Sequence, residues 1–229
     1  MTELVVTRHQ SIFNPLEHPV PIHIIGVGAT GSRIGMALIE LGMTNITFHD
    51  FDIVEPHNLA NQAFAHEHIG VHKVDAMAAL YCSKTGTKEP PKQMVFSQQP
   101  VPNPEIPLEG VVFLLTDTME SRREIYEKCL KGNPNVLHVI ETRMAATHGN
   151  VFQFNPNHAL KAAAWVNTLI DDDDAETSAC GASISVGTTA SVIANFAVWQ
   201  MMHYLADQHA MSEVTNVYLK PFIVTTESL

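Results

Sequence analysis

The chain has 229 residues, 45% of them hydrophobic, and a formal net charge of −11. That length suits one domain with embellishments, or at most two, and the apolar content suffices for a substantial core. The acidic balance argues against binding of nucleic acid, which needs a basic surface, and against binding to an anionic membrane.

The N-terminal segment does not read as a secretion signal, because charged side chains and prolines interrupt residues 1–20. No apolar run in the sequence approaches the roughly 20 residues that a membrane-spanning helix needs. Cys82, Cys129 and Cys180 form no C-x-x-C pair, which argues against a disulfide framework. We therefore expect a cytoplasmic protein that enters no membrane.

A glycine-rich segment follows the first predicted strand, residues 20–27. Gly26, Gly28 and Gly31 form the pattern G-x-G-x-x-G, and apolar residues then recur at helical spacing. In this context the first glycine makes a tight turn, the second lets the backbone approach a phosphate, and the third lets helix and strand pack closely. The helix start offers free N–H groups to an anion. The segment therefore predicts a nucleotide site.

Asp50 follows the second predicted strand, residues 45–48, and lies about 20 residues beyond the glycines. At that place a carboxylate accepts hydrogen bonds from a ribose hydroxyl. Asp52 is either a supporting partner of this site or a solvated acid in the loop of residues 51–62. The glycine pattern alone does not separate NAD from ATP, so the choice depends on the residues downstream.

The elements after this loop alternate in type. Helices are predicted at residues 73–83 and 120–130, and strands at residues 94–96, 111–115 and 136–140. The run 111–115 is apolar throughout, as expected of a central parallel strand covered on both faces. Six prolines within residues 89–110 predict a surface loop. The alternation predicts an α/β fold with a Rossmann-like, doubly wound, mostly parallel sheet.

The pattern changes after Glu141. A short strand is predicted at residues 151–154, flanked by glycine and proline, so some later strands are expected to run antiparallel. Residues 182–205 predict a long helix whose weak polarity indicates burial against the sheet or a second subunit. Residues 214–224 predict a final strand pair or an edge strand.

Several separated motifs then occur in order and at consistent spacing between residues 20 and 205. They are the glycine pattern, the loop from Asp50 to Gln62, the segment Ile69-Gly70-Val71-His72-Lys73, the strand end Thr116-Asp117-Thr118, and Arg122 in the following helix. In these motifs the chain resembles the ThiF/MoeB/HesA family, the bacterial relatives of ubiquitin-activating enzymes. The resemblance implies ATP-dependent adenylation of the C-terminal carboxylate of a small β-grasp, ubiquitin-like or sulfur-carrier protein, or of a peptide.

The same resemblance implies a role for each motif. Asp50 would hold the ribose of ATP, Asn58 and Gln62 would face the phosphates, Lys73 would neutralise phosphate charge, and Asp117 would coordinate Mg²⁺. Attack of a carboxylate on a phosphate brings anions together, so the site needs cations and a metal ion. The candidate nucleotide-binding residues are Gly26, Gly28, Gly31, Asp50, Asp52, Asn58, Asn61, Gln62 and Lys73, and the candidate catalytic residues are Lys73, Asp117, Arg122 and Cys180.

Two positions depart from the family pattern. Asn61 replaces the arginine of N-L-x-R-Q, and Thr118 replaces the asparagine of T-D-N. Losing a guanidinium near the phosphates removes a charge-assisted, often bidentate contact. Either another arginine compensates, or the chemistry is slow, or the chain binds nucleotide or a β-grasp partner without activating it. The candidate replacements are Arg33, Arg122, Arg143 and the Arg8 of a second subunit.

The resemblance also divides the chain, taken as a single adenylation domain of residues 1–229. It implies a nucleotide-binding core at about 20–155, a crossover loop at about 156–181, and a C-terminal helix and strands at 182–229. Cys180, in the crossover loop, is either a thioester-forming nucleophile or a small residue in a turn. Three scattered cysteines cannot form a four-cysteine zinc site, so the resemblance is to the shorter, zinc-free branch.

Family members are commonly dimeric, so we expect a homodimer. Two other functions remain open. A binding module that keeps the fold without catalysis is supported by Asn61. An NAD-dependent oxidoreductase is disfavoured, because it would need neither Lys73 nor Asp117.

Overall fold

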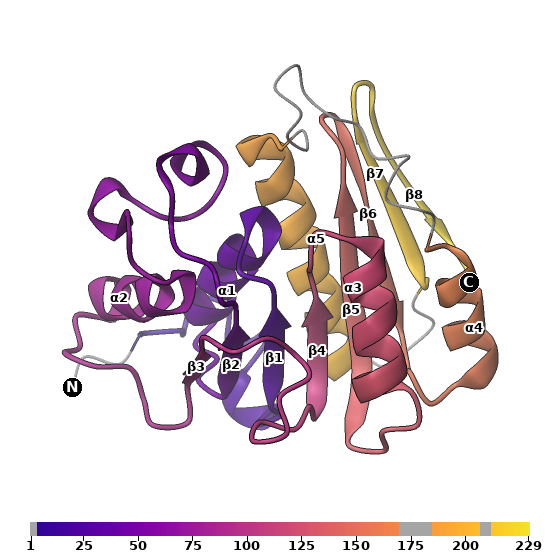
Figure 1. The fold of residues 1–229 in the computed structure, drawn as a ribbon, viewed down its shortest axis with the longest axis horizontal. Helices are drawn as coiled ribbons and strands as arrows, with labels where there is room; N and C mark the ends of the chain where they lie inside the picture. Colours follow the sequence, from indigo (N-terminus) through magenta and orange to yellow (C-terminus); the bar gives the residue numbers. More distant parts are fainter. Residues whose placement is uncertain (1–3, 170–184, 207–211) are drawn as a thin grey trace.

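The computed structural model describes residues 4–169, 185–206 and 212–229. Within these residues, eight strands form one sheet in the order β3-β2-β1-β4-β5-β6-β7-β8 (Figure 1). The strands are β1 (Ile22–Ile25), β2 (Ile46–His49), β3 (Val95–Ser97), β4 (Gly110–Leu114), β5 (Val136–Met144), β6 (His148–Phe154), β7 (Val214–Leu219) and β8 (Phe222–Glu227). Neighbours from β3 through β5 are parallel, and those from β5 through β8 are antiparallel. The predicted α/β fold is confirmed.

Helices cover both faces of this sheet. They are α1 (Ala29–Glu40), α2 (Lys73–Thr85), α3 (Met119–Ile125) with the π-helix η4 (Tyr126–Leu130), α4 (Ala159–Asn167) and α5 (Gly187–Ala206), besides the short 3-10 helices η1 (Pro15–Glu17), η2 (Pro56–Ala60) and η3 (His66–His68). One core cluster joins α1, α2 and α5 to the sheet. A second cluster joins α3, η4 and α4 to the opposite face.

The strand order reverses between β1 and β4. From β1 the chain proceeds outward to β2 and β3, then crosses back to β4 on the other side of β1. In open α/β sheets, ligands bind beyond the carboxyl ends of the strands at such a switch point. The glycine loop follows β1, and Asp117 follows β4, so the fold brings both to this edge.

Two elements differ from the sequence expectation. Strand β5 continues to Met144 and pairs directly with β6, so both strands are longer than predicted. Helix α4 lies within the segment that was expected to be a crossover loop. Its alanine-rich sequence favours helix, and Trp165, 0% exposed, anchors it by packing against Phe154 and Tyr126.

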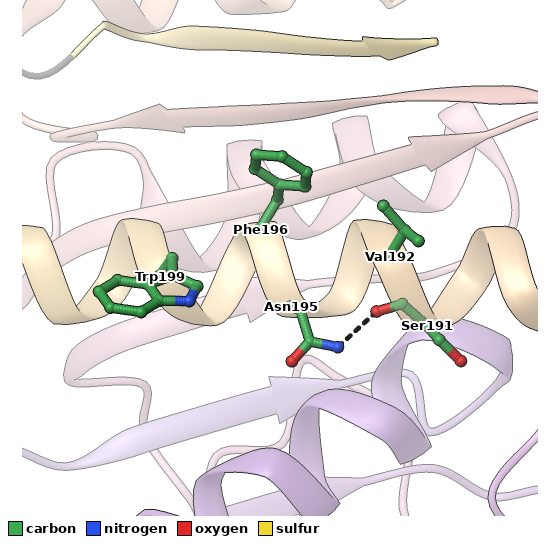
Figure 2. Close-up of a pocket in the computed structure, with 5 residues that line it drawn as sticks. All are labelled: Ser191, Val192, Asn195, Phe196 and Trp199. Atoms are coloured by element: carbon green, nitrogen blue, oxygen red, sulfur yellow. Dashed lines mark hydrogen bonds between the residues drawn. The ribbon is translucent and has the colours of Figure 1, made fainter. Parts of the chain in front are cut away.

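The long C-terminal helix predicted at residues 182–205 is present as α5, the part before residue 185 lying outside the described residues. One side of α5 is buried against α1 and the sheet. The other side carries a hollow lined by Ser191, Val192, Asn195, Phe196 and Trp199 (Figure 2). Trp199 remains 50% exposed there. No helix in the described part of the chain combines the length and apolar character needed to cross a membrane.

Two buried histidines link β1 and β2. His23 and His49 are 3% and 1% exposed, and His23 Nδ1 lies 3.0 Å from His49 Nε2. Burial lowers the pKa of His23 to about 4 and that of His49 to about 3. Both imidazoles are therefore neutral in the folded protein at pH values where the unfolded chain, with a histidine pKa of about 6.5, binds protons.

This pair predicts acid sensitivity. Because the folded pKa values are lowered, stability is complete above about pH 6.5 and falls as the pH drops toward the folded pKa values. Each of these two histidines should lower the free energy of unfolding by about 2 kcal/mol when the pH falls from 7.5 to 5. Urea titrations at both pH values measure the loss, and a double His23→Gln, His49→Gln variant should show less of it. His203→Gln, at an exposed position, should retain the full loss; an equal loss in all three proteins would contradict the assignment.

Candidate nucleotide-binding site

The glycine loop has the shape that its sequence predicts. Gly26 has φ +93°, and a Cβ there would lie 2.7 Å from the carbonyl oxygen of Leu115. A Cβ on Gly31 would lie 2.0 Å from the carbonyl oxygen of Gly26. A Cβ on Gly28 would meet no atom within 4 Å, so this glycine faces open space at the start of α1. Packing explains the first and third glycines, and the open side at Gly28 leaves room for a ligand phosphate to approach the backbone.

Asp50 connects this loop to the end of β2. Its Oδ2 accepts a hydrogen bond of 2.7 Å from the Val27 N–H, and its Oδ1 accepts one of 2.9 Å from the Asp52 N–H. Burial raises the pKa of Asp50, while Lys73 and the two backbone donors oppose that rise. Each carboxylate oxygen has a second acceptor position. The side chain is therefore fixed in place and still able to accept a ribose hydroxyl.

Lys73 is the first residue of α2 and is held by both aspartates. Its Nζ donates to Asp52 Oδ2 at 2.7 Å and lies 3.9 Å from Asp50 Oδ2. The Lys73 N–H also donates to the carbonyl oxygen of Asp52 at 2.9 Å. Asp52, left open by the sequence as partner or solvated acid, is thus a partner of Lys73. The ammonium is nearly buried, with its side chain 10% exposed, beside the glycine loop.

The loop between β2 and α2 is ordered by its own polar contacts. Asn58 is 6% exposed, and its Oδ1 accepts a hydrogen bond of 2.9 Å from the Glu55 N–H. Gln62 follows and donates its N–H to the carbonyl oxygen of Asn58 at 2.8 Å. Asn58 therefore shapes η2, which delivers Asn61 and Gln62 to the neighbourhood of α1 and α5.

Asp117 is exposed in the turn after β4. The next residue, Thr118, caps α3, since its Oγ1 accepts the Ser121 N–H at 3.1 Å. In the described part of the chain, no group of three or more His, Cys, Asp or Glu side chains could hold a metal ion by itself. Mg²⁺ commonly binds through one or two carboxylates, waters and ligand phosphates, so a lone exposed Asp117 fits that mode.

Arg122 lies in a buried network that the sequence did not reveal. It forms an ion pair with Glu141 Oε1, and its Nε donates to the carbonyl oxygen of Thr116 at 2.9 Å. Glu141 is 0% exposed and also receives Arg143 Nε at 3.0 Å and Trp165 Nε1 at 3.2 Å. The only sequence signal for Glu141 is an acid directly after the apolar run of β5.

The four arginines proposed as replacements for the guanidinium missing at Asn61 therefore have different surroundings. Arg122 and Arg143 both pair with Glu141. Arg8 lies in an exposed turn near the N-terminus. Arg33 lies beside Asn61, where its Nε donates to the Asn61 carbonyl oxygen at 3.4 Å.

The three cysteines also differ in their surroundings. Cys180, the candidate nucleophile, lies outside the described residues. Cys82 in α2 and Cys129 in η4 are free and partly buried. Burial raises the pKa of the Cys129 thiol, which disfavours a reactive thiolate there.

Comparison with known proteins gives a family and a set of similar folds. The model of the ThiF family matches residues 18–227. A search of curated proteins by sequence gives no match. Among solved structures, Escherichia coli MccB with ATP is 11% identical with a TM-score of 0.70, over 95% of this chain and 65% of that one. The microcin C7 biosynthetic enzyme MccB with N-formylated MccA is 11% identical with a TM-score of 0.69, over 95% and 66% of the two chains.

A third structure, PaaA, is 15% identical with a TM-score of 0.68, over 95% of this chain and 75% of that one. At these identities the likeness concerns the fold. The chain spans 66% of the MccB chain solved with succinimide, so about a third of that protein has no counterpart here.

Proposed function

The chain belongs to the ThiF family, and from this premise we propose that it is an ATP-dependent adenylyltransferase. The observation that carries the proposal is the arrangement around Gly28. The open side of the glycine loop, the fixed carboxylate of Asp50 and the nearly buried ammonium of Lys73 meet at the switch point of the sheet. A backbone cradle, a ribose acceptor and a cation are the elements that an ATP site requires.

In the proposed reaction, a carboxylate oxygen of the substrate forms a bond to the α-phosphorus of ATP. The bond between that phosphorus and its bridging oxygen to the β-phosphate breaks, and pyrophosphate leaves with the electron pair. The product is a mixed anhydride of the carboxylate and AMP. Asp50 holds the ribose, and the glycine loop and Lys73 bind the phosphates. Mg²⁺ at Asp117 would offset the repulsion between the substrate carboxylate and the phosphates that the reaction brings together.

The proposed substrate is the C-terminal carboxylate of a small β-grasp protein or a peptide. MccB has been crystallised with MccA, and the similarity of fold supports a peptide-sized acyl substrate here.

We also propose that the chain acts as a single domain in the cytoplasm and forms a homodimer through the exposed side of α5. The hollow on that side presents Phe196 and Trp199 and is lined by no charged side chain (Figure 2). Light scattering of the purified protein tests the dimer.

A non-catalytic nucleotide-binding module remains the second candidate, and Asn61 in place of the family arginine favours it. Membership of the ThiF family argues against the third candidate function, an NAD-dependent oxidoreductase.

Titration of the purified chain with ATP and Mg²⁺ tests the proposed function. We expect micromolar binding that weakens about tenfold or more in Asp117→Asn, because the metal loses its protein carboxylate. Glu120→Gln, which changes an exposed acid in the first turn of α3, serves as the control. Failure of the folded wild-type chain to bind ATP would refute the proposed adenylyltransferase function. ATP binding without pyrophosphate exchange in the presence of a library of peptide carboxylates would favour the binding module.

A further inference from the structure

Arg33 is a half-buried arginine on α1, close to the glycine loop. It is the fifth residue of a helix that begins at the carboxyl end of β1. No carboxylate lies within ion-pair distance of Arg33 among the residues that the structure describes. Burial lowers its pKa, so the fold places a costly charge here, and the described residues provide no anion to offset it.

Unpartnered polar atoms occur in the two segments that contact Arg33, at residues 61–62 and just before Gly187. Asn61 Oδ1 and Gln62 Oε1 are buried without a hydrogen-bond partner among the described residues, and so is Ser185 Oγ, just before α5. Buried polar groups nearly always have partners, so several orphans together call for an explanation. The amide groups of Asn61 and Gln62 can turn either their oxygen or their NH₂ toward a ligand.

The start of α5 completes this corner. A Cβ on Gly187 would lie 2.7 Å from the Ala60 carbonyl oxygen and 3.1 Å from Arg33 Nη2. Any side chain at position 187 would therefore enter the space beside the guanidinium. Glycine allows η2, α1 and α5 to approach closely while keeping that space clear.

We propose that Arg33, with Asn61 and Gln62 beside it, binds the phosphate chain of the nucleotide. The inference rests on the proposed function and deepens it by naming the cation that acts together with Lys73. Lys73 binds from the side of Asp50, and Arg33 binds from the side of α5. Arg122 and Arg143 pair with Glu141, whereas Arg33 has no carboxylate within ion-pair distance among the described residues and lies against Asn61.

The test compares ATP with adenosine, which has the same base and ribose without phosphates. Arg33→Gln should weaken ATP binding by about 10- to 100-fold in isothermal titration, because hydrogen bonds to charged groups contribute this much. Adenosine binding, followed by saturation-transfer NMR because it is weak, should stay within about twofold, since no phosphate contact is lost. Arg33→Lys keeps the charge and loses the forked geometry, so it should lie between wild type and Arg33→Gln.

Lys128→Gln is the control for loss of a positive charge, because Lys128 is an exposed lysine of η4, on the opposite face of the sheet, and pairs with Glu124 of α3. ATP affinity within about twofold of wild type in Arg33→Gln would overturn the inference, given the size of such contacts. Equal weakening of ATP and adenosine would also overturn it, because the effect would then come from the fold around the loop. Failure of the wild-type chain to bind ATP would instead refute the proposed function, whereas the Arg33 variants decide the role of this residue alone.

Discussion

Lys73→Met is expected to reduce ATP-dependent pyrophosphate exchange by at least about 100-fold, the loss typical of removing one preorganised charge-stabilising group. Lys73 Nζ is nearly buried and lies 2.7 Å from Asp52 and 3.9 Å from Asp50. A cation in such surroundings interacts with a phosphate far more strongly than a surface lysine does. Methionine keeps the apolar stem of the side chain, so the change removes mainly the charge.

Lys84→Met is the matched control, because Lys84 lies on the same helix and forms an exposed pair with Glu40. It should leave exchange unchanged. Asp52→Asn provides a second comparison: it frees Lys73 from its nearest anion and should alter exchange less than Lys73→Met does. Thermal unfolding of each variant shows whether it folds. Near-wild-type exchange in a folded Lys73→Met protein would remove this lysine from the chemistry.

The parts of the site predicted well from sequence are those fixed by local motifs at strand ends. Gly26 and Gly31 are required where backbone atoms approach too closely for a Cβ, and Asp50 follows directly from β2. In a parallel sheet the carboxyl ends of neighbouring strands meet at one edge. Motifs about 20 residues apart, such as the glycine loop and Asp50, therefore converge without any knowledge of tertiary packing.

The parts that could not be predicted depend on contacts between distant segments. The pairing of Asp52 with Lys73 follows from how the loop between β2 and α2 folds back. The place of Arg33 beside Asn61 depends on the approach of η2 and α5 to α1. Sequence spacing encodes neither the path of this loop nor the approach of η2 and α5 to α1. Asp52 and Arg33 could therefore be named as candidates, but their contacts could not be predicted.

The Glu141 network is the clearest example of this limit. An acid after an apolar run looks like an ordinary strand end, because nothing near it in sequence indicates burial. Glu141 becomes fully buried only when α3 brings Arg122 and α4 brings Trp165 onto the same face of the sheet. The sequence motif makes Arg122 a catalytic candidate, and the structure adds that it donates to the Thr116 carbonyl beside Asp117.

Glu141→Gln is therefore expected to destabilise the fold by about 3–5 kcal/mol, the usual cost of removing one partner from a buried ion pair. Arg122 and Arg143 would both lose the carboxylate that offsets their charge, and a neutral amide cannot replace it. Urea unfolding at pH 7.5 measures the change. Glu124→Gln, which removes an exposed carboxylate paired with Lys128, should cost no more than about 1 kcal/mol.

The order of the variants tests the cause as well as the size of this effect. Arg143→Gln removes one cation and leaves Glu141 with Arg122 and Trp165 as partners, so it should destabilise less than Glu141→Gln, which leaves two cations without their anion. The side chain of Arg143 is also 14% exposed, so screening by water reduces the stability that is lost when Arg143 is substituted. If Arg143→Gln were the more damaging variant, its contacts with Thr168 and Phe152, and not the charge of Glu141, would hold α4 against the sheet.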